Sequence, residues 1–368
     1  MRVSARAYRM TRILGFESSC DETAVSVVEA DESGRLRILS SIVASQIETH
    51  RLYGGVVPEI AGRAHIEAIT NITYEALNEA SLTPADIDAV AVTTHPGLIG
   101  ALLVAVNFAK AFAAANRLPL VGVDHMKGHI ASAYLLEHAP KPPFVALAVS
   151  GGHTTLFYVE SYTRYHRIGE TRDDAIGEAF DKIGRIIGIP YPAGAGFDKL
   201  AREGFVRATG KEEDFFAAFR KCEAYKNPLY KLPSPALSDG SLDFSFSGLK
   251  TAAINLLHHH EQTGEPLDRA LFAARYTYEA VEAVAKKTEL ALSRYEGVPL
   301  VVSGGVAANS HLRGRLTALC GKMKRTLYIP PLSLCGDNGA MIAAQGYYEF
   351  IAGARADSSL NASAADEE

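Results

Sequence analysis

The chain has 368 residues, of which 48% are hydrophobic and 21% charged, and this globular composition excludes a mostly disordered or fibrous protein. At about 100–200 residues per domain, the length predicts two domains. Lys and Arg number 37 and Asp and Glu number 42, so the net charge is −5. Such a chain is not a general nucleic-acid coat, because neutralising phosphates needs an excess of basic residues, although a local patch or a partner protein can still bring it to RNA.

The ordered sequence opens with a pattern typical of a β-hairpin. An apolar run at residues 13–16 is followed by a polar turn at 17–23 and a second apolar run at 24–28. The same pattern returns with a strand at 144–149, a turn at 150–154 and a strand at 155–159. The repetition predicts two similar halves, each beginning with a hairpin that presents backbone amides.

Helices and strands are predicted to alternate between and after the hairpins, which indicates an α/β fold. In the first half we expect helices at 60–80 and 98–116, strands at 89–93 and 120–123, and a helix that ends near 137. In the second half we expect helices at 175–187 and 269–295, a strand at 300–302 and a helix from about 309. Residues 191–196 are predicted to form a loop, and residues 203–243 to be irregular.

The Pro-rich segment at 139–143 predicts the domain boundary. We therefore expect an N-terminal lobe over residues 11–140 and a C-terminal lobe over residues 144–352. Residues 1–10 and 355–368 are predicted to be disordered, and Met10 is an alternative start to Met1. The first segment is basic, as in a transit peptide, but it is short and lacks an apolar face.

The cysteines indicate the redox compartment of the protein, and the most apolar segment indicates whether it spans a membrane. Four cysteines without a C-x-x-C pair predict reduced thiols in a cytosolic protein. The most apolar stretch, residues 98–115, contains Asn107 and Lys110, which favours a buried helix over a membrane span.

Two histidines suggest a metal site. His125 and His129 are four residues apart, so on a helix they lie on one face. Met126 stands where a zinc protease of this motif carries its general base, so that base is missing. Asp337 at the start of the last helix is a candidate third ligand. Ordinary core histidines and an ordinary helix N-cap explain the same residues.

Two Ser-Gly-Gly turns follow apolar strands, at residues 150–152 and 303–305. Glycine lets the backbone approach a ligand closely, and successive amides can hold a phosphate. Together with the turn at 17–23 they indicate a nucleotide-binding cleft between two lobes. Asp198 follows a Gly-rich loop and can reach a ribose hydroxyl or cap the next helix.

Charged residues gather in two further places. Acidic and basic side chains at positions 178, 181, 182 and 185 share one helix face, as in a solvated salt-bridged helix. Residues 297–336 contain five basic residues and no acidic one. This stretch is a candidate footprint for a phosphate backbone, and a solvated helix face explains it nearly as well.

Seven motifs occur in an order that resembles one known family, the tRNA adenosine threonylcarbamoyltransferases, formerly described as O-sialoglycoprotein endopeptidases. The resemblance extends over about residues 11–350. The pattern of motifs resembles the bacterial and mitochondrial branch of the family. The motifs are GFESSCDET at 15–23, HMKGH at 125–129, VSGGHT at 149–154, DAIGEAFD at 174–181, FSFSGLK at 244–250, SGGVAAN at 303–309 and CGDNG at 335–339.

The resemblance implies a two-lobed, actin-like and sugar-kinase-like ATPase fold with a central cleft. It implies one divalent metal, Fe²⁺ or alternatively Zn²⁺, held by His125, His129 and Asp337. It also implies that Asp21 and Glu22 are needed for catalysis. The residues implied to bind the threonylcarbamoyl-adenylate are Ala148, Val149, Ser150, Gly151, Gly152, Asp181, Gly194, Asp198 and Asn309.

The implied reaction transfers a threonylcarbamoyl group from threonylcarbamoyl-AMP to N6 of the adenosine next to the anticodon, in tRNAs that read codons beginning with A. The implied partners are tRNA, a non-catalytic paralogue of the same fold and a small P-loop ATPase. A homodimer is the alternative to the paralogue. No association with a membrane is expected. The expected location is the cytoplasm, with the mitochondrial matrix as the alternative.

Three other functions fit parts of the sequence. An ATP-dependent kinase or hydrolase can use the same two-lobed fold, because a fold does not fix its chemistry. A metallopeptidase fits the histidine pair but lacks the glutamate beside His125. A non-catalytic scaffold has no reason to keep a complete set of metal ligands.

Overall fold

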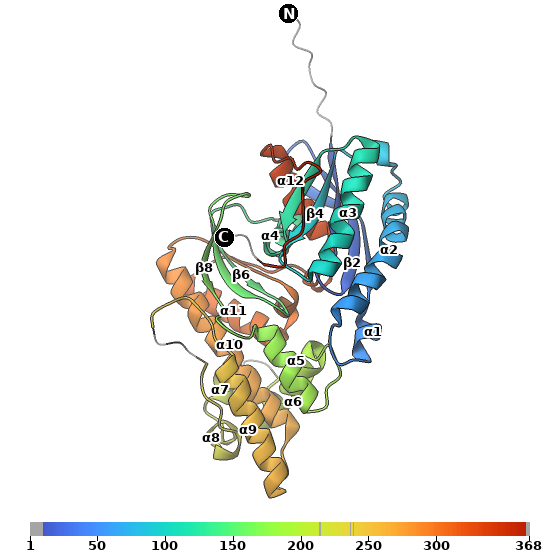
Figure 1. The fold of residues 1–368 in the computed structure, drawn as a ribbon. Helices are drawn as coiled ribbons and strands as arrows, with labels where there is room; N and C mark the ends of the chain where they lie inside the picture. The colour runs from blue at the N-terminus through green and yellow to red at the C-terminus, as the bar shows by residue number, and fades with distance from the viewer. Residues whose placement is uncertain (1–9, 213–214, 236, 238, 366–368) are drawn as a thin grey trace, which may run out of the picture. The chain divides into compact units, whose positions relative to one another are not determined.

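The computed structural model describes residues 10–212, 215–235, 237 and 239–365, and the chain divides into two compact units (Figure 1). The first unit comprises residues 1–142, 160–165 and 330–368, and the second comprises residues 143–159 and 166–329. The division between residues 142 and 143 falls within the predicted boundary at 139–143. The predicted extent of the second lobe, 144–352, differs from the structure, because residues 160–165 and 330–352 belong to the first unit.

The first unit is built on a five-stranded sheet with the strand order β3-β2-β1-β4-β5. The predicted hairpin is confirmed, because β1 and β2 pair antiparallel from Thr11 with Ala30 to Glu17 with Ala24. β4 and β5 continue the sheet in parallel. The strands are β1 (Thr11–Glu17), β2 (Glu22–Ala30), β3 (Leu36–Ser45), β4 (Ala89–His95) and β5 (Leu120–Asp124).

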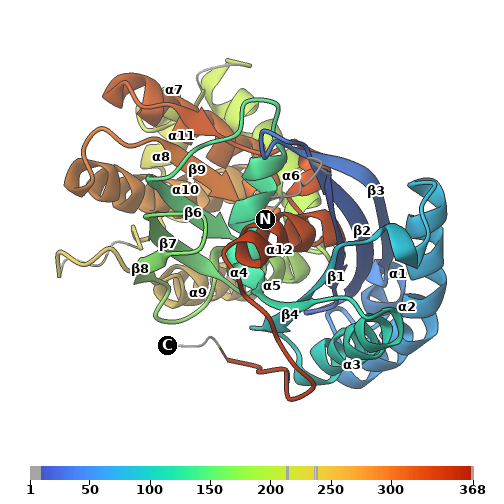
Figure 2. The same cartoon turned by 90° about the horizontal axis from the view of Figure 1, so that it is seen from above.

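Helices cover both faces of this sheet (Figures 1 and 2). Leu14 and Phe16 of β1 belong to the core cluster that also contains side chains of α2 and α3. Side chains alternate between the faces of a strand, so Gly15 faces the opposite side, where a Cβ atom would collide with Ala343 of α12. The helices are α1 (Ile47–Arg51), α2 (Pro58–Glu79), η1 (Pro84–Asp86), α3 (Ile99–Asn116), α4 (His125–Ala131), η2 (Ser132–Leu135), η5 (Leu332–Leu334) and α12 (Gly339–Ile351).

The second unit repeats the topology of the first. Its sheet has the order β10-β9-β6-β7-β8, with β6 and β7 antiparallel and β6 and β9 parallel. The hairpin again forms the first two strands, so the prediction of two similar halves is confirmed. The strands are β6 (Phe144–Val149), β7 (Thr154–Val159), β8 (Tyr165–Glu170), β9 (Leu300–Ser303) and β10 (Leu327–Tyr328).

The helices of the second unit differ from the prediction in one region. A helix occupies residues 194–209, where a loop and an irregular segment were expected, because Phe197, Ala201 and Phe205 give it a buried face. This helix packs against α10, and Gly204 meets the backbone of Ala270 there. The helices are α5 (Ile176–Ile186), α6 (Gly194–Thr209), α7 (Phe215–Phe219), α8 (Glu223–Lys226), η3 (Pro228–Tyr230), α9 (Ser247–Thr263), α10 (Arg269–Arg294), η4 (Gly305–Ala308) and α11 (Ser310–Met323).

The C-terminal segment is ordered as far as the structure describes it, so the prediction of disorder from residue 355 is wrong for residues 355–365. Ala356 forms a bridge with Leu120, and the Ser363 amide donates to the Thr94 carbonyl oxygen. Leu360 packs against the core of the first unit. These contacts hold a polar segment whose composition alone indicates disorder. Residues 1–9 and 366–368 lie outside the described residues.

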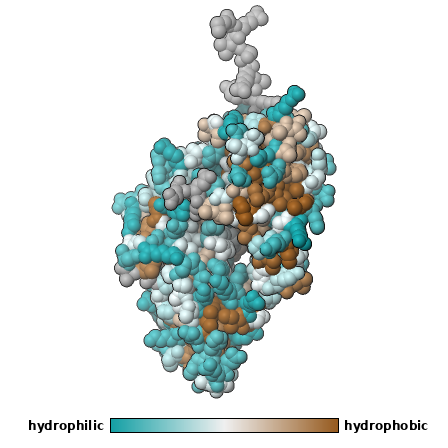
Figure 3. Space-filling model, in the orientation of Figure 1, coloured by the Kyte–Doolittle hydropathy of each residue, from teal (hydrophilic) through white to brown (hydrophobic). Residues whose placement is uncertain are grey.

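One helix among the described residues, α3, is long and apolar enough to cross a membrane by length and composition alone. It packs one side against α2 and β4, and its buried residues include Leu102, Val106 and Phe112. Apolar surface is visible over α3 in Figure 3. The contacts with β4 and α2 are those of a helix in the core of the first unit, as the sequence predicts.

Candidate metal and adenylate sites

Helix α4, which follows β5 directly, carries the two histidines in the first unit. Asp124 ends β5 and caps α4, because its carboxylate accepts hydrogen bonds from the Met126 amide at 2.7 Å and the Lys127 amide at 3.2 Å. The cap starts the helix directly at His125. His129 is one turn further along, so both imidazole rings lie on one face, with their centroids 4.5 Å apart.

Asp337 completes a group of three possible metal ligands. Its Oδ1 atom lies 3.2 Å from His129 Nε2 and 3.7 Å from His125 Nε2, and all three ligand atoms lie within 4.8 Å of one another. Asn338, and not Asp337, caps α12, because its side chain accepts a hydrogen bond from the Met341 amide. The alternative that Asp337 is the helix N-cap is therefore wrong.

The buried ring of His129 supports a cation at this position. Neither ring nitrogen of His129 has a hydrogen-bond partner among the described residues, and the side chain is 1% exposed. A buried polar atom without a partner is costly, and a cation bound at Nε2, the nitrogen that lies beside Asp337, removes that cost for this atom. Two imidazoles and a carboxylate form a ligand set suited to a divalent transition metal. The site can therefore hold a metal ion.

A second carboxylate lies on the other side of the His125 ring. Glu17, at the end of β1, is fully buried, and its Oε2 atom lies 3.0 Å from His125 Nδ1. Burial alone raises the pKa of Glu17, but the charge and hydrogen bond of His125 bring it below its ordinary value. Burial alone lowers the pKa of His125, whereas Glu17 and Asp337 raise it to about 9.

The predicted catalytic pair lies where the turn after β1 meets β2, with Asp21 as the last turn residue and Glu22 as the first residue of β2. Glu22 accepts a hydrogen bond from Ser45 through Oε1, while Oε2 has no hydrogen-bond partner among the described residues. Burial and the charge of Asp21 raise the pKa of Glu22 to about 8. A carboxyl group with this pKa can exchange a proton near neutral pH.

A buried network holds this turn in place. His65 of α2 lies with Nε2 at 3.0 Å from the Cys20 carbonyl oxygen and Nδ1 at 2.7 Å from Thr23 Oγ1. The Gln46 amide donates to the Asp21 carbonyl oxygen, and the Gln46 side chain lies against His50 and His65. Burial lowers the pKa of His65. The neutral ring donates to the Cys20 carbonyl oxygen through Nε2 and accepts from the Thr23 hydroxyl through Nδ1.

Sequence reasoning missed Glu17, His65 and Gln46 as site residues. Glu17 belongs to a quoted motif, and its place directly after an apolar strand was a signal that a buried carboxylate stands there. His65 and Gln46 gave no comparable signal, because their role depends on contacts between segments far apart in the chain.

The two Ser-Gly-Gly turns meet in the second unit. A Cβ atom on Gly304 would collide with the Val149 carbonyl oxygen, so the second turn packs directly on the end of β6. The Glu178 amide of α5 donates to the Gly151 carbonyl oxygen at 3.0 Å. A Cβ atom on Gly151, Gly152 or Gly305 would meet no protein atom within 4 Å. The turns therefore have open space beside their backbone, as a bound ligand requires.

The other predicted adenylate residues lie in the middle of α5, in the first turns of α6 and at the N-cap of α11. Asp181 accepts a hydrogen bond from the Ala193 amide at 2.8 Å, directly before Gly194 begins α6. Asp198 accepts from the Ser310 amide at 3.1 Å, and Asn309 caps α11. Ala148 and Val149 are the buried last residues of β6. The structure thus brings all of the predicted adenylate residues into one unit.

The basic stretch at 297–336 is partly neutralised within the second unit. Arg315 forms an ion pair with Glu282 of α10, and Lys322 lies 3.1 Å from Glu289 of the same helix. Arg313 Nε donates to the Ala307 carbonyl oxygen. The two acidic partners, Glu282 and Glu289, come from outside the stretch, so its local charge overstated the positive surface available to a phosphate backbone.

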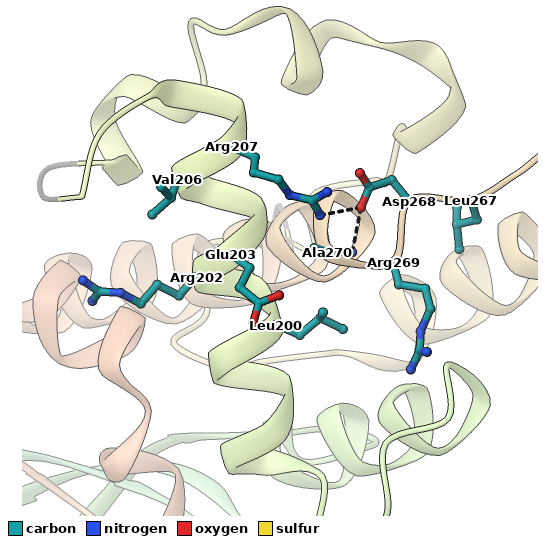
Figure 4. A pocket seen from close by; sticks show the side chains of 9 residues that line it. All are labelled: Leu200, Arg202, Glu203, Val206, Arg207, Leu267, Asp268, Arg269 and Ala270. Atoms are coloured by element: carbon teal, nitrogen blue, oxygen red, sulfur yellow. Dashed lines mark hydrogen bonds and ion pairs between the residues drawn. The ribbon is translucent and has the colours of Figure 1, made fainter.

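A depression of about 720 Å³ lies elsewhere in the second unit, between α6 and the start of α10 (Figure 4). Figure 4 shows Arg207 directed toward Asp268, and the two side chains form an ion pair of 2.8 Å. Its lining contains none of the predicted adenylate or metal residues. The lining residues are Leu200, Arg202, Glu203, Val206, Arg207, Leu267, Asp268, Arg269 and Ala270.

Comparison with known proteins decides the family. The family model for tRNA N6-adenosine threonylcarbamoyltransferase matches residues 37–344. The protein of that name from Geobacillus thermodenitrificans is 48% identical over 354 residues, which cover 95% of each chain. Its namesake from Lactobacillus delbrueckii subsp. bulgaricus is 45% identical over 95% of this chain and 94% of that one. The chain belongs to the tRNA N6-adenosine threonylcarbamoyltransferase family.

The predicted resemblance and fold class are both confirmed. Among solved structures, T. kodakarensis HypF has a TM-score of 0.51 at 13% identity, over 94% of this chain and 48% of that chain. At this identity the likeness shows the fold alone. The two α/β units with matching mixed sheets are those of the actin-like, sugar-kinase-like class.

Proposed function

We propose that this chain transfers the threonylcarbamoyl group from threonylcarbamoyl-AMP to N6 of the adenosine next to the anticodon, in tRNAs that read codons beginning with A. The observation that carries this proposal is the match to curated threonylcarbamoyltransferases along 95% of the chain. The structure supports it, because each unit holds one of the residue sets that the reaction needs.

The second unit binds the adenylate in this proposal. The amides of Gly151 and Gly152 hold the phosphate, since backbone amides in a glycine turn can donate to anionic oxygens, whereas the Ser150 amide donates to the His153 carbonyl oxygen and keeps the turn in shape. Asp181, Gly194, Asp198 and Asn309 line the same site. The open space beside Gly151 and Gly152 supports this assignment.

The first unit supplies the metal centre and the acidic pair. His125, His129 and Asp337 hold one divalent cation, and the family resemblance implies Fe²⁺, with Zn²⁺ as the alternative, since two imidazoles and one carboxylate suit either ion. When bound, such a cation supplies a Lewis acid with open positions for oxygen ligands.

Proton transfer is assigned to the pair Asp21 and Glu22. The exocyclic amine of adenosine is a poor nucleophile, because its lone pair is delocalised into the ring. It attacks the carbamoyl carbon, the bond from that carbon to the phosphate oxygen breaks, and AMP leaves. One of these two carboxylates accepts the proton that the amine loses. The pKa of about 8 for Glu22 suits this role near neutral pH.

A peptidase mechanism has less support. Met126 follows His125 and is 2% exposed, so the position that carries the general base in zinc peptidases of this motif holds a buried thioether. The ATP-dependent kinase or hydrolase is the remaining alternative. It differs from the transferase in requiring ATP as the reactant.

We propose tRNA, a non-catalytic paralogue and a small P-loop ATPase as partners in the cytoplasm, with a homodimer as the alternative to the paralogue. Exposed apolar side chains on α2 and α3, among them Ile66 at 64% and Ile99 at 47% exposure, offer a surface for a protein of the same fold. A partner also helps an acidic chain to bind an acidic tRNA.

The test supplies labelled threonine, bicarbonate, ATP, the adenylate-forming enzyme, the partners and unmodified tRNA. We expect labelled threonylcarbamoyladenosine in the nucleoside digest of the tRNA. The control is Asp337→Asn, which removes one ligand charge and should reduce the yield. Wild-type reactions that leave the tRNA unlabelled would reject the proposal.

A further inference from the structure

We propose that Glu17 is a positioning residue that fixes the ring of His125, with Nδ1 protonated and Nε2 directed at the metal site. The inference rests on the proposed function, because it takes His125 as a metal ligand. It adds a residue that does not contact the cation. Ligating histidines commonly donate their second ring N–H to a carboxylate, which fixes both the tautomer and the ring orientation.

Three donors converge on the Glu17 carboxylate. Oε1 accepts from the Ser19 amide, and Oε2 accepts from Thr93 Oγ1 at 2.6 Å and from His125 Nδ1 at 3.0 Å. These donors belong to the turn after β1, to β4 and to α4. The carboxylate therefore links the three segments that surround the His125 ring.

Burial makes this arrangement selective for one ring tautomer. The Glu17 side chain is 0% exposed and that of His125 is 6% exposed, so solvent does not replace a missing donor. Ser19 Oγ also lies 3.2 Å from Nδ1. An ionised carboxylate offers acceptors only, so Nδ1 must present its proton to it. The lone pair of a metal-binding ring is then on Nε2, the atom that lies 3.7 Å from Asp337.

A glutamine at position 17 cannot satisfy the same donors. If its amide nitrogen replaces Oε2, it presents N–H groups to Nδ1 and favours the tautomer with the proton on Nε2. If the amide is flipped, the nitrogen faces the Ser19 amide, and two donors oppose each other. The first orientation reverses the tautomer, and the second leaves Nδ1 only a neutral and weaker acceptor, so either one weakens the His125 ligand. The shape of the side chain is kept, so the substitution tests the acceptor and not the packing.

The experiment measures Zn²⁺ affinity of the full chain by competition with a chromophoric chelator, without tRNA or adenylate. For Glu17→Gln we expect affinity about 10–100-fold below wild type, the range seen when second-sphere partners are removed. Nitrogen-15 NMR of the Zn²⁺-loaded wild type should show a proton on His125 Nδ1, and the variant should lose or strongly shift that signal.

Glu29→Gln is the matched control, because Glu29 is a nearly buried glutamate of the same unit that pairs with Arg12 and Arg37 away from the site. It should bind Zn²⁺ like wild type. If Glu17→Gln does not fold, Thr93→Val takes its place, since it removes only the hydroxyl that holds Oε2, and it should weaken Zn²⁺ binding by a smaller factor.

Wild-type affinity together with an unchanged Nδ1 signal in a folded Glu17→Gln or, failing that, Thr93→Val protein would overturn the inference. His125→Ala separates this outcome from a failure of the proposed function. If His125→Ala abolishes Zn²⁺ binding but Glu17→Gln does not weaken it, only the role of Glu17 is wrong. If His125→Ala leaves Zn²⁺ binding unchanged, the metal site itself is wrong.

Discussion

Gly304 and Gly305 follow one another in the turn after β9, yet their surroundings differ. Gly304 has φ of +91° and packs on the Val149 carbonyl oxygen, whereas the Cβ position of Gly305 is open. Gly305→Val should therefore change the free energy of unfolding by less than about 1 kcal/mol. It should also weaken binding of a non-hydrolysable adenylate analogue by about tenfold or more, measured by calorimetry, because the side chain occupies ligand space. Gly151→Val should behave in the same way.

Gly304→Val is the matched contrast, because both its backbone conformation and its contact require glycine. It should destabilise the second unit by about 3 kcal/mol or more, measured by denaturant unfolding. Wild-type analogue affinity in Gly151→Val and Gly305→Val would mean that the turns have a structural role only.

Glu22 is predicted to give both the reaction and the stability a dependence on pH. The ionised fraction of Glu22 rises through its pKa of about 8, so single-turnover transfer should rise with pH toward that value. Glu22→Gln should remove this rise and most of the activity. A variant with the same pH profile as wild type would assign the proton transfer to another group.

The sign of the stability effect follows from the same pKa. A folded-state pKa raised from the ordinary 4.5 to about 8 means that the folded protein keeps a proton that the unfolded chain releases. Stability from this group is present below about pH 4.5 and is lost as the pH rises through 8. Glu22→Gln should therefore have a higher Tm than wild type above pH 8, measured by calorimetry. A lower Tm there would contradict the burial argument.

At the scale of elements, α2 holds the turn that carries the acidic pair. His65→Ala leaves the Cys20 carbonyl oxygen and the Thr23 hydroxyl without their buried partner, which should cost about 2–3 kcal/mol of stability. Amide hydrogens of residues 18–23 should exchange faster, and transfer should fall while Zn²⁺ affinity is retained. Glu75→Ala, at an exposed position of α2 outside the apolar surface proposed for the partner, should change none of these. Unchanged amide exchange of residues 18–23 in His65→Ala would contradict the role of His65 in holding this turn.

The packing of α11 on α10 changes the expectation for tRNA binding. Arg315 is already paired with Glu282, so Arg315→Gln should alter the slope of log affinity against log salt by less than the roughly 0.7–0.9 that one phosphate contact contributes. Filter binding across a salt series, with the partners present, measures the slope. A slope that falls by the full amount of one phosphate contact would support the basic stretch at 297–336 as the tRNA-binding surface.

At the scale of the whole molecule, the sequence predicts most of what is local. The two hairpins, the long helix at 269–294 and the His125–His129 pair follow from apolar runs and spacing. The placement of α12 and of residues 355–365 in the first unit does not follow from the local sequence. It depends on the missing side chain of Gly15, which lets α12 pack closely on β1, and on the contact of Leu360 with the core of the first unit. The partners of Arg315 and Glu17 also come from distant segments.

The transferase account is tested most directly by a single-turnover reaction without ATP. Preformed threonylcarbamoyl-AMP and unmodified tRNA are mixed with the chain, with and without the proposed partners, and the nucleosides are resolved by mass spectrometry. The account predicts threonylcarbamoyladenosine and an equal amount of AMP from wild type, and neither product above background from a His125→Ala, His129→Ala double variant. A wild-type protein that leaves the tRNA unmodified under all of these conditions, yet consumes ATP when ATP is added, would contradict the account and favour the kinase or hydrolase.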